Sequence, residues 1–476
     1  MKTLVGREKE IEKLNEYVNS GRAEFVALYG RRRVGKTFLI NQVFKKRLAF
    51  SVTGVLGGGP DEQMEAFVDA LETYSGEAVK RPKTWMQAFI LLKKYLTHRC
   101  SSLKHCIIFI DELPSFDTQR SGFVRALGYF WNSWASLQDK VTLIVCGSAT
   151  SWMIRNVVDD KGGLHDRITH EMHLRPFSLY EVEVYLKSRG FVWNRLSVLQ
   201  AYMVFGGIPY YLSLLQNNES FVQNIDRLFF GEDEEMRREY RRLYQTLFKS
   251  PEGYMAIISL LATNHSGFTR KEIAERLGEI SGGKLSSKLE DLVNCDIIRR
   301  YNVRKKKIST TSAVYQLTDF YSLFYQSFIG KAETEKNYWS NHLNTSEVNA
   351  WLGFAFERVC AAHIEQIKHA LHIDRISTKH YSWRSSDLQN RAQVDLLIER
   401  ADDIVNLCEI KYSDGKYLIS KSEEEKIRNR MTAFKRETGL KSAVWITFVS
   451  TYGLTPNSHS DVVVENIVMD DLFVCT

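Results

Sequence analysis

The stretch from residue 24 to residue 46 constrains the fold most strongly. The apolar segment EFVALYG is followed by the loop GRRRVGKT at 30–37 and by KTFLINQVFKK, whose apolar residues have helical spacing. Strand, glycine loop and helix in this order are typical of a phosphate-binding loop. Gly30 and Gly35 let successive backbone N–H groups face an anion, and the helix adds its positive end. The stretch predicts a nucleotide site on a parallel α/β sheet.

The chemistry expected of such a site is present on both sides of the loop. Lys36 can reach the β and γ phosphates of ATP, and the Thr37 hydroxyl can bind Mg²⁺. Downstream, the apolar run at 107–110 is typical of a strand buried on both faces, and it ends in two acids. Asp111 would support Mg²⁺ through water, and Glu112 would polarise the attacking water. ATP and Mg²⁺ are therefore the predicted cofactors.

A third apolar segment, residues 141–149, ends in Ser148. This side chain could sense the γ phosphate, or it could lie in an ordinary turn. Ligands bind at the carboxyl ends of strands in open α/β sheets, which suits all three segments. The three arginines at 31–33 are poor candidates for gripping phosphate, because the backbone of the loop makes those contacts. Contact with another domain, a partner or nucleic acid is favoured over plain solvation.

These motifs, together with LVGREKEIEKL near the start and GGIPYYL at 206–212, resemble bacterial and archaeal P-loop ATPases near the AAA+ and STAND branches. The resemblance runs through about residue 330 and implies a P-loop core with a helical lid. It also implies several positions at the nucleotide: Gly6 and Arg7 beside the adenine, Pro209 closing over the nucleotide from the lid, and Arg167 as a trigger arginine near the γ phosphate, with Arg155 and Arg175 as rivals.

Residues 250–330 show short helices followed by a basic hairpin. The third helix would begin near Lys284 and Lys288, and the hairpin has six basic residues and no acid between residues 299 and 307. This order is typical of a winged helix-turn-helix with a basic wing that contacts the DNA backbone. The alternative is a module used for packing or switching.

The last third of the chain has the order helix, strand, strand, helix, strand, beginning with a long helix at 347–371. Asp395 lies in one strand, and Glu409 and Lys411 share a face of the next because they are two residues apart. The two carboxylates could hold Mg²⁺, and Lys411 could orient or deprotonate a water. Glu357 from the long helix could be an additional ligand. A structural ion network is the alternative.

This arrangement resembles the PD-(D/E)xK nuclease superfamily, with Val394 in place of the proline of that motif. The resemblance implies a restriction-endonuclease-like α/β domain. The predicted division of the chain is an ATPase core at 1–175, a helical lid at 176–248, a winged helix at 249–330, a linker at 331–346 and a nuclease-like domain at 347–476.

Composition adds broad limits. The formal net charge is +7, which permits an anionic partner without requiring one. The seven cysteines form no CxxC pair and are expected to be buried thiols in a reducing cytosol. The start of the chain lacks an apolar signal core, and no apolar run reaches membrane-spanning length. We therefore expect a cytoplasmic protein without a membrane partner.

Three functions remain open on the sequence alone. The leading one is an ATP-hydrolysing switch or motor coupled to DNA binding and Mg²⁺-dependent DNA cleavage. The second is an ATP-gated DNA-binding or signalling protein with an inactive nuclease-like domain. The third is an AAA+ ATPase resembling replication loaders, which works as a homo-oligomer or with a protein partner.

Overall fold

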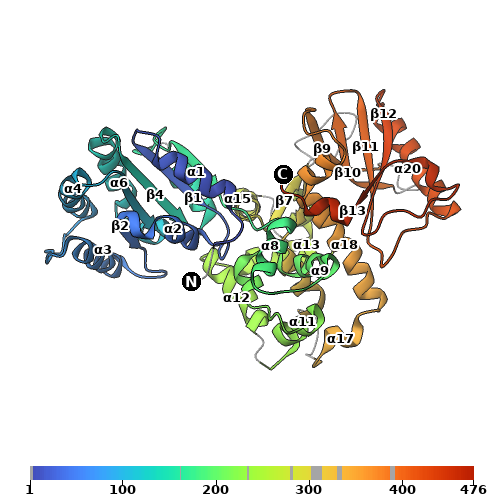
Figure 1. Cartoon of the computed structure of the whole chain (residues 1–476), viewed down its shortest axis with the longest axis horizontal. Coiled ribbons are helices and arrows are strands. Elements are labelled where there is room, and N and C mark those ends of the chain that lie inside the picture. The colour runs from blue at the N-terminus through green and yellow to red at the C-terminus, as the bar shows by residue number, and fades with distance from the viewer. Residues whose placement is uncertain are drawn as a thin grey trace. The chain divides into compact units, whose positions relative to one another are not determined.

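The computed structural model describes residues 4–160, 162–232, 235–278, 282–301, 313–329, 335–385 and 392–476. The chain divides into two compact units, residues 1–176 and 177–476. Each unit is described by itself. Figure 1 shows the elements of both.

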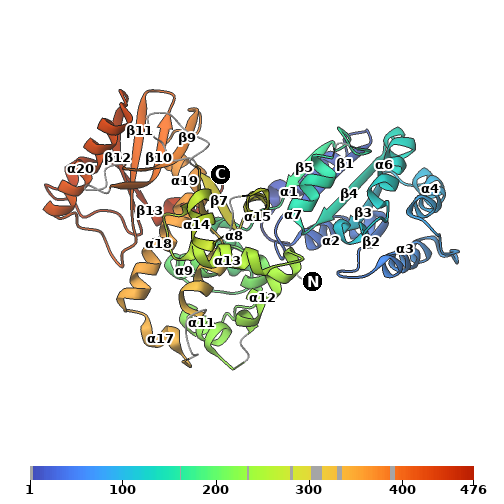
Figure 2. The same ribbon diagram turned by 180° about the vertical axis from the view of Figure 1, so that it is seen from behind.

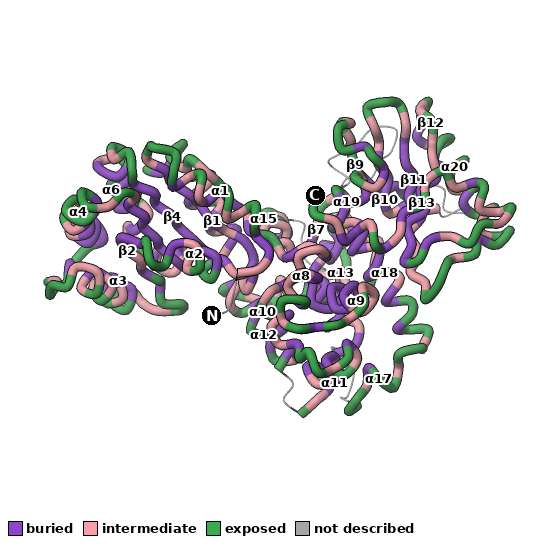
Figure 3. The backbone as a smooth tube through the Cα atoms, viewed as in Figure 1, coloured by how far each residue is buried: buried purple, intermediate pink, exposed green. Residues whose placement is uncertain are grey.

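The first unit contains a five-stranded sheet in which every pairing is parallel. The strand order is β2-β3-β4-β1-β5, so β4 lies between β3 and β1 (Figure 2). The strands are β1 (Glu24–Tyr29), β2 (Leu48–Thr53), β3 (Cys106–Asp111), β4 (Val141–Gly147) and β5 (His170–His173). The predicted parallel α/β sheet is confirmed. The burial of β1 and β4 follows from their place inside it (Figure 3).

Helices connect these strands and supply an aromatic core. They are α1 (Glu8–Val18), α2 (Lys36–Phe44), α3 (Pro60–Ser75), α4 (Trp85–Ser101), α5 (Leu113–Phe116), α6 (Phe123–Ser133) and α7 (Thr150–Met153). Trp85 packs edge-on against Phe116 and Phe123, with ring centroids 5.5 and 4.9 Å away. Such contacts between buried rings fix how α4 and α6 pack together.

One cysteine prediction is wrong. Cys100 at the end of α4 and Cys106 at the start of β3 form a disulfide, because the short turn between the two elements brings their Cα atoms to 5.2 Å. The other five cysteines are free, and all of them except Cys475 are buried.

The second unit begins with helices where the lid was predicted. They are α8 (Leu179–Ser188), α9 (Arg195–Phe205), α10 (Pro209–Ser213), α11 (Phe221–Phe230) and α12 (Glu235–Leu247). Although α12 carries many charged residues, one of its faces is buried. Tyr240 and Tyr244 of α12 are buried, and Tyr240 stacks on Tyr325 at 3.8 Å.

A small three-stranded sheet follows. Its strands are β6 (Phe268–Thr269), β7 (Ile298–Tyr301) and β8 (Val314–Leu317), in the order β6-β8-β7. The helices of the same segment are α13 (Glu252–Ala262), α14 (Arg270–Leu277) and α15 (Gly283–Asn294). We call residues 252–317 the middle module. Thr269 and Glu272 form a capping box at the start of α14. Most of the predicted basic wing, including Lys305–Lys307, lies outside the described residues.

The C-terminal α/β domain has a sheet of order β13-β12-β11-β10-β9 (Figure 1). Its strands are β9 (Thr378–Arg384), β10 (Gln393–Arg400), β11 (Ile404–Lys411), β12 (Ala443–Ser450) and β13 (Val463–Val468), and its main helices are α18 (Ser346–Ala362), α19 (Ile364–Ala370) and α20 (Lys421–Thr438). The pairs β9–β10 and β10–β11 are antiparallel, and the pairs β11–β12 and β12–β13 are parallel.

The sequence missed two edge strands and one break in this domain. Polar residues interrupt the apolar pattern of β9 and β13, as is common for strands with only one neighbour. The long helix predicted at 347–371 divides at His363, whose backbone angles are not helical. The predicted linker contains a short helix, α17 (Tyr338–His342). Among the described helices, none is both long and apolar enough to cross a membrane.

Candidate nucleotide site and acidic site

The phosphate loop joins the end of β1 to the start of α2. Gly30 has φ of 142°, and a Cβ on it would lie 2.3 Å from the carbonyl oxygen of Leu174. Gly35 is the N-cap of α2 with φ of 94°. The first glycine is therefore needed for close backbone approach, and the second for a left-handed turn into the helix.

Lys36 is the first residue of α2, and its side chain is buried under the loop. Its ammonium Nζ donates hydrogen bonds to the carbonyl oxygens of Gly30 at 2.7 Å and Arg31 at 3.0 Å. Only 5% of the residue is exposed. The Lys36 ammonium therefore lies within the curve of the loop. The sequence predicted that this ammonium contacts the β and γ phosphates.

Thr37 and Asp111 meet at the carboxyl edge of the sheet. Oγ1 of Thr37 donates a 2.7 Å hydrogen bond to Oδ2 of Asp111, which ends β3. A hydroxyl and a carboxylate side by side are the oxygen donors that Mg²⁺ prefers. The residues present therefore fit the predicted Mg²⁺ at the nucleotide.

Glu112 follows Asp111 in a strained left-handed conformation, with φ of 46°. Its backbone N–H donates to Oδ1 of Asp111 at 3.0 Å. Its carboxylate Oε2 accepts hydrogen bonds from the hydroxyl of Ser148 at 2.9 Å and from the backbone N–H of Ser148 at 3.3 Å. The end of β4 therefore orients the predicted water-polarising carboxylate, which the sequence did not indicate.

Arg7 connects the phosphate loop to the segment after β5. It follows Gly6 in a left-handed turn with φ of 79°, and only 4% of it is exposed. Its Nη2 donates to the carbonyl oxygens of Val34 at 3.4 Å and Arg175 at 2.6 Å. The resemblance implied that Gly6 and Arg7 border the adenine. The contacts add that Arg7 braces the loop, and sequence spacing alone could not reveal this.

Arg167, named first as the trigger arginine, does not lie near the phosphate loop of its own unit. β5 pairs in parallel with β1, with His170 beside Val26 and His173 beside Tyr29. Arg167 precedes β5 and is exposed, whereas the phosphate loop follows Tyr29. About seven strand residues, or roughly 20 Å, separate the two levels of the sheet. Arg167 therefore lies at the amino edge, opposite the nucleotide.

The rival arginines follow strands at the carboxyl edge. Arg175 comes directly after β5, and Arg155 lies in the π-helical turn Ile154–Val158 that continues α7 after β4. Both residues are exposed. The parallel register favours either of them over Arg167 for contact with phosphate on the same chain.

The loop arginines have unequal environments. Arg31 is 3% exposed, while Arg32 and Arg33 are half-buried. Plain solvation is therefore wrong for Arg31. Pro209, expected to close over the nucleotide, is the first residue of α10 in the second unit. Its role at the nucleotide remains a prediction.

The predicted acids of the C-terminal domain meet across β10 and β11. Leu396 pairs with Cys408, so Asp395 and Glu409 are the next residues along the antiparallel pair. Directly opposed residues share a face of the sheet. Glu409 and Lys411 lie on one face of β11, as predicted, and Asp395 lies where the pairing of β10 with β9 shifts register between Val394 and Leu397. Mg²⁺ is commonly held by one or two carboxylates with water and phosphate oxygens, so these two acids fit a Mg²⁺ site.

Protein cations hold the Glu409 carboxylate. Nζ of Lys411 lies 3.1 Å from Oε1, and the guanidinium of Arg430 on α20 pairs with Oε2. Glu409 is 7% exposed. The sequence did not identify Arg430, because it lies in a helix with many charges on both sides. These pairs are also what a structural ion network would show.

Asp395 has a different partner, which the sequence also missed. Nε2 of Gln393 donates to Oδ1 of Asp395 at 2.5 Å, and Oε1 of Gln393 accepts from the hydroxyl of Ser266 at 2.8 Å. Ser266 belongs to the middle module. The acidic site is thus in contact with a neighbouring part of the second unit.

Glu357 of α18, which the sequence suggested as an additional metal ligand, stays a prediction. Burial raises the pKa of Glu357 to about 8, and the charge of Asp395 adds to the effect. Cys360 on the same helix lies near Cys408 of β11. Burial raises the pKa of the Cys360 thiol, and Cys408 adds to the effect. The charge of Glu409 also raises the pKa of Glu357, and the charge of Lys411 lowers it. No group of three or more His, Cys, Asp or Glu side chains suited to a metal occurs within the described ranges.

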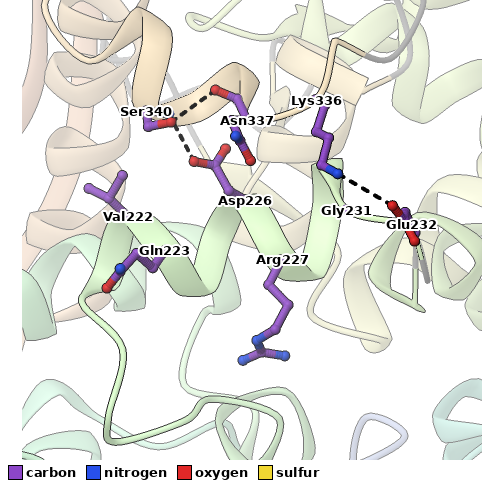
Figure 4. A pocket seen from close by; sticks show the side chains of 9 residues that line it. All are labelled: Val222, Gln223, Asp226, Arg227, Gly231, Glu232, Lys336, Asn337 and Ser340. Atoms are coloured by element: carbon purple, nitrogen blue, oxygen red, sulfur yellow. Dashed lines mark hydrogen bonds and ion pairs between the residues drawn. The ribbon is translucent and has the colours of Figure 1, made fainter.

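A shallow pocket of the second unit serves a structural purpose (Figure 4). The carboxylate of Asp226 accepts hydrogen bonds from the backbone N–H groups of Trp339 at 2.9 Å and Ser340 at 3.1 Å. Lys336 pairs with Glu232 at 3.3 Å. These contacts fasten α17 to α11, and we assign no ligand to the pocket.

Comparisons with known proteins agree with the geometry of the first unit. Residues 4–215 match the family model of an ATPase domain predominantly from Archaea. The chain is 27% identical over 363 residues to uncharacterized protein MJECL04 of Methanocaldococcus jannaschii, covering 75% of this chain and 76% of that protein. A 44-residue stretch, 9% of this chain, is 44% identical to uncharacterized ATP-binding protein MJ0423 of the same organism and covers 75% of it.

Solved structures are more distant. The Walker-type ATPase PABY2304 of Pyrococcus abyssi matches with 18% identity and a TM-score of 0.48, covering 68% of this chain and 96% of that one.

Proposed function

We propose that this chain, whose residues 4–215 match the family model of an ATPase domain predominantly from Archaea, hydrolyses ATP and uses nucleotide state to control a C-terminal domain that processes DNA. The observation that carries the ATPase proposal is the convergence of Lys36, Thr37, Asp111 and Glu112 at one edge of the sheet. The name of the ATP-binding relative supports the choice of nucleotide.

The site residues divide the work of hydrolysis. The loop N–H groups and Lys36 hold the β and γ phosphates. Thr37 and Asp111 would hold Mg²⁺, which would supply positive charge to neutralise those phosphates. Glu112 accepts a hydrogen bond from water and directs it at the γ phosphorus, and Ser148 keeps that carboxylate aimed. The new P–O bond forms as the bond to the leaving ADP oxygen breaks.

The second unit is suited to follow the nucleotide as one body. The backbone N–H of Leu179 at the start of α8 donates to Nε2 of His363 at 2.9 Å. Nε2 of Gln200 on α9 donates to the hydroxyl of Tyr412 at 3.0 Å. These bonds tie the predicted lid to the C-terminal domain, so we infer that a lid movement carries that domain with it.

DNA cleavage is the proposed activity of the C-terminal domain. Asp395 and Glu409 adjoin the paired residues Leu396 and Cys408, and Lys411 lies two residues beyond Glu409, which supports a PD-(D/E)xK-like nuclease site. The predicted winged helix, with Lys284 and Lys288 on α15, would contact the DNA backbone. A switch with an inactive domain is the second candidate, favoured by the double ion pairing of Glu409.

Nucleotide binding is the first test. Lys36→Ala should weaken Mg·ATP affinity by about 10- to 100-fold, because it removes charged hydrogen bonds to phosphate. Lys46→Ala is the matched control, since Lys46 is an exposed lysine near the end of the same segment. Unchanged affinity of Lys36→Ala in titration calorimetry would refute the nucleotide site.

Cleavage is the second test. Single- and double-stranded DNA are incubated with Mg²⁺ or Mn²⁺, with and without ATP, alongside the Asp395→Ala, Lys411→Ala variant. Cleavage that the variant loses supports the nuclease, and dependence on ATP supports the coupling. No cleavage while ATP still binds favours the switch. An ATPase rate that rises with chain concentration would favour the homo-oligomeric loader-like function.

A further inference from the structure

Gln393 lies on β10 two residues before Asp395, on the same face of the strand. Its amide is oriented by its two partners. A carboxylate only accepts hydrogen bonds, so Nε2 must face Asp395 and Oε1 must face Ser266. The Ser266 hydroxyl therefore donates to Oε1. Each member of the chain Ser266–Gln393–Asp395 fixes the orientation of the next.

The loop that carries Ser266 is held on both sides. The hydroxyl of Tyr301 on β7 donates to the carbonyl oxygen of Ser266 at 2.6 Å, and Nη2 of Arg384 on β9 donates to the same oxygen at 3.4 Å. The neighbouring His265 stacks on Phe354 of α18, with ring centroids 3.7 Å apart. The middle module and the C-terminal domain thus both contact this loop.

Buried cations strengthen the same contact. The guanidinium of Arg358 on α18 donates to the carbonyl oxygens of His265 and, at 3.3 Å, Leu317. Arg299 of β7 donates to Gln316 at 2.6 Å. Burial lowers the pKa of Arg299 to about 10, and the charge of Asp395 opposes that effect. The Arg299 guanidinium of the middle module is therefore close enough to the Asp395 carboxylate to interact with its charge.

We propose that Gln393 is a positioning residue for Asp395, and that Ser266 of the middle module sets its orientation, so that the acidic site is complete only while the middle module is docked. This inference rests on the proposed nuclease function. It makes the middle module a structural part of the site as well as a candidate DNA contact.

Cleavage kinetics test the positioning role. Gln393→Ala should lower kcat by about 10- to 100-fold and raise the Mg²⁺ concentration for half-maximal cleavage, because a ligand that loses its orienting partner binds metal less well. KM for DNA should change little. Ser266→Ala should act in the same direction, and Ser266→Thr should retain activity. Gln393→Ala and Ser266→Ala together should cost no more than Gln393→Ala alone.

Amide hydrogen exchange provides a readout that does not need cleavage. Ser266→Ala should speed exchange at the start of β10, and Gln393→Ala should speed it in residues 264–267. Ser188→Ala is the matched control, because the Ser188 hydroxyl bonds only to the Tyr185 carbonyl of its own helix at 2.7 Å.

The outcomes separate the two proposals. Wild-type cleavage with unchanged kcat, Mg²⁺ dependence and exchange in Ser266→Ala and Gln393→Ala would overturn this inference alone. A wild type that cleaves no DNA would overturn the nuclease proposal and the positioning role together. Reduced kcat with faster exchange across the contact would establish the chain from Ser266 to Asp395.

Discussion

The hydroxyl of Thr37 lies 2.7 Å from the carboxylate of Asp111, which joins the phosphate loop after β1 to the end of β3. Seventy-three residues separate them in the sequence, yet the parallel sheet places both at one edge, with β4 between their strands. This pair is the physical basis for the proposed Mg²⁺-dependent nucleotide site.

Removing the Thr37 hydroxyl should weaken Mg·ATP binding. Thr37→Ala should lower affinity by about tenfold, since one oxygen donor and its bond to Asp111 are lost. Thr37→Ser keeps the hydroxyl and should remain close to wild type. Titration calorimetry with Mg·ATP compares the two, and equal losses in both would argue that the methyl group matters instead.

Glu112 should matter for hydrolysis more than for binding. Glu112→Gln should lower kcat for ATP by about 10²- to 10⁴-fold with little change in affinity, because only the water-directing carboxylate is lost. Ser148→Ala should have a smaller effect in the same direction, as Glu112 loses its 2.9 Å partner. A phosphate-release assay measures both, and full activity of Glu112→Gln would exclude this role.

Arg7 should stabilise the first unit as well as the loop. Arg7→Ala removes the donor to the carbonyl oxygens of Val34 and Arg175, at a cost of about 1–3 kcal/mol in the free energy of unfolding. Urea denaturation followed by tryptophan fluorescence measures the change. Arg125→Ala is a suitable comparison, because Arg125 is an exposed arginine on α6 of the same unit.

Arg167 should not act on nucleotide bound to its own chain. Arg167→Ala should leave the ATPase rate within about twofold at low chain concentration, since the side chain lies roughly 20 Å from the phosphate loop along the sheet. Arg175→Ala and Arg155→Ala test the rivals in the same assay. A large loss for Arg167→Ala that appears only at high concentration would mean that it serves a neighbouring chain.

His363 should make the second unit sensitive to acid. Burial lowers its pKa to about 4, while its Nε2 accepts from Leu179 and its Nδ1 lies 2.8 Å from the carbonyl oxygen of Val359. The unfolded chain therefore binds the proton more readily, and the free energy of unfolding should fall as pH drops from about 6.5 to 4. The loss should reach about 3 kcal/mol.

A variant isolates this effect. His363→Gln keeps an acceptor for the Leu179 N–H and has no titrating group. Its unfolding free energy, measured in urea between pH 7 and 4.5, should lack the part of the slope that His363 contributes. An identical pH slope in the wild type and the variant would contradict the assignment.

Local patterns along the chain were sufficient to predict the parallel sheet, the phosphate loop and the acids that end β3. Lys36 and Thr37 follow a glycine turn. The geometry of this turn depends on residues adjacent in the chain, so the sequence alone indicates where the two side chains lie. The same is true of Glu409 and Lys411, because the two-residue period of a strand decides which of its side chains share a face.

Contacts between distant segments required the tertiary structure. The parallel register of β5 with β1 placed Arg167 at the edge of the sheet opposite the phosphate loop. Ser148 beside Glu112, Arg7 beneath the loop, and Ser266 beside Gln393 bring together residues 27 to 168 positions apart. The register and packing of whole strands and helices determine which of these residues meet. The spacing of residues along the chain does not predict such contacts.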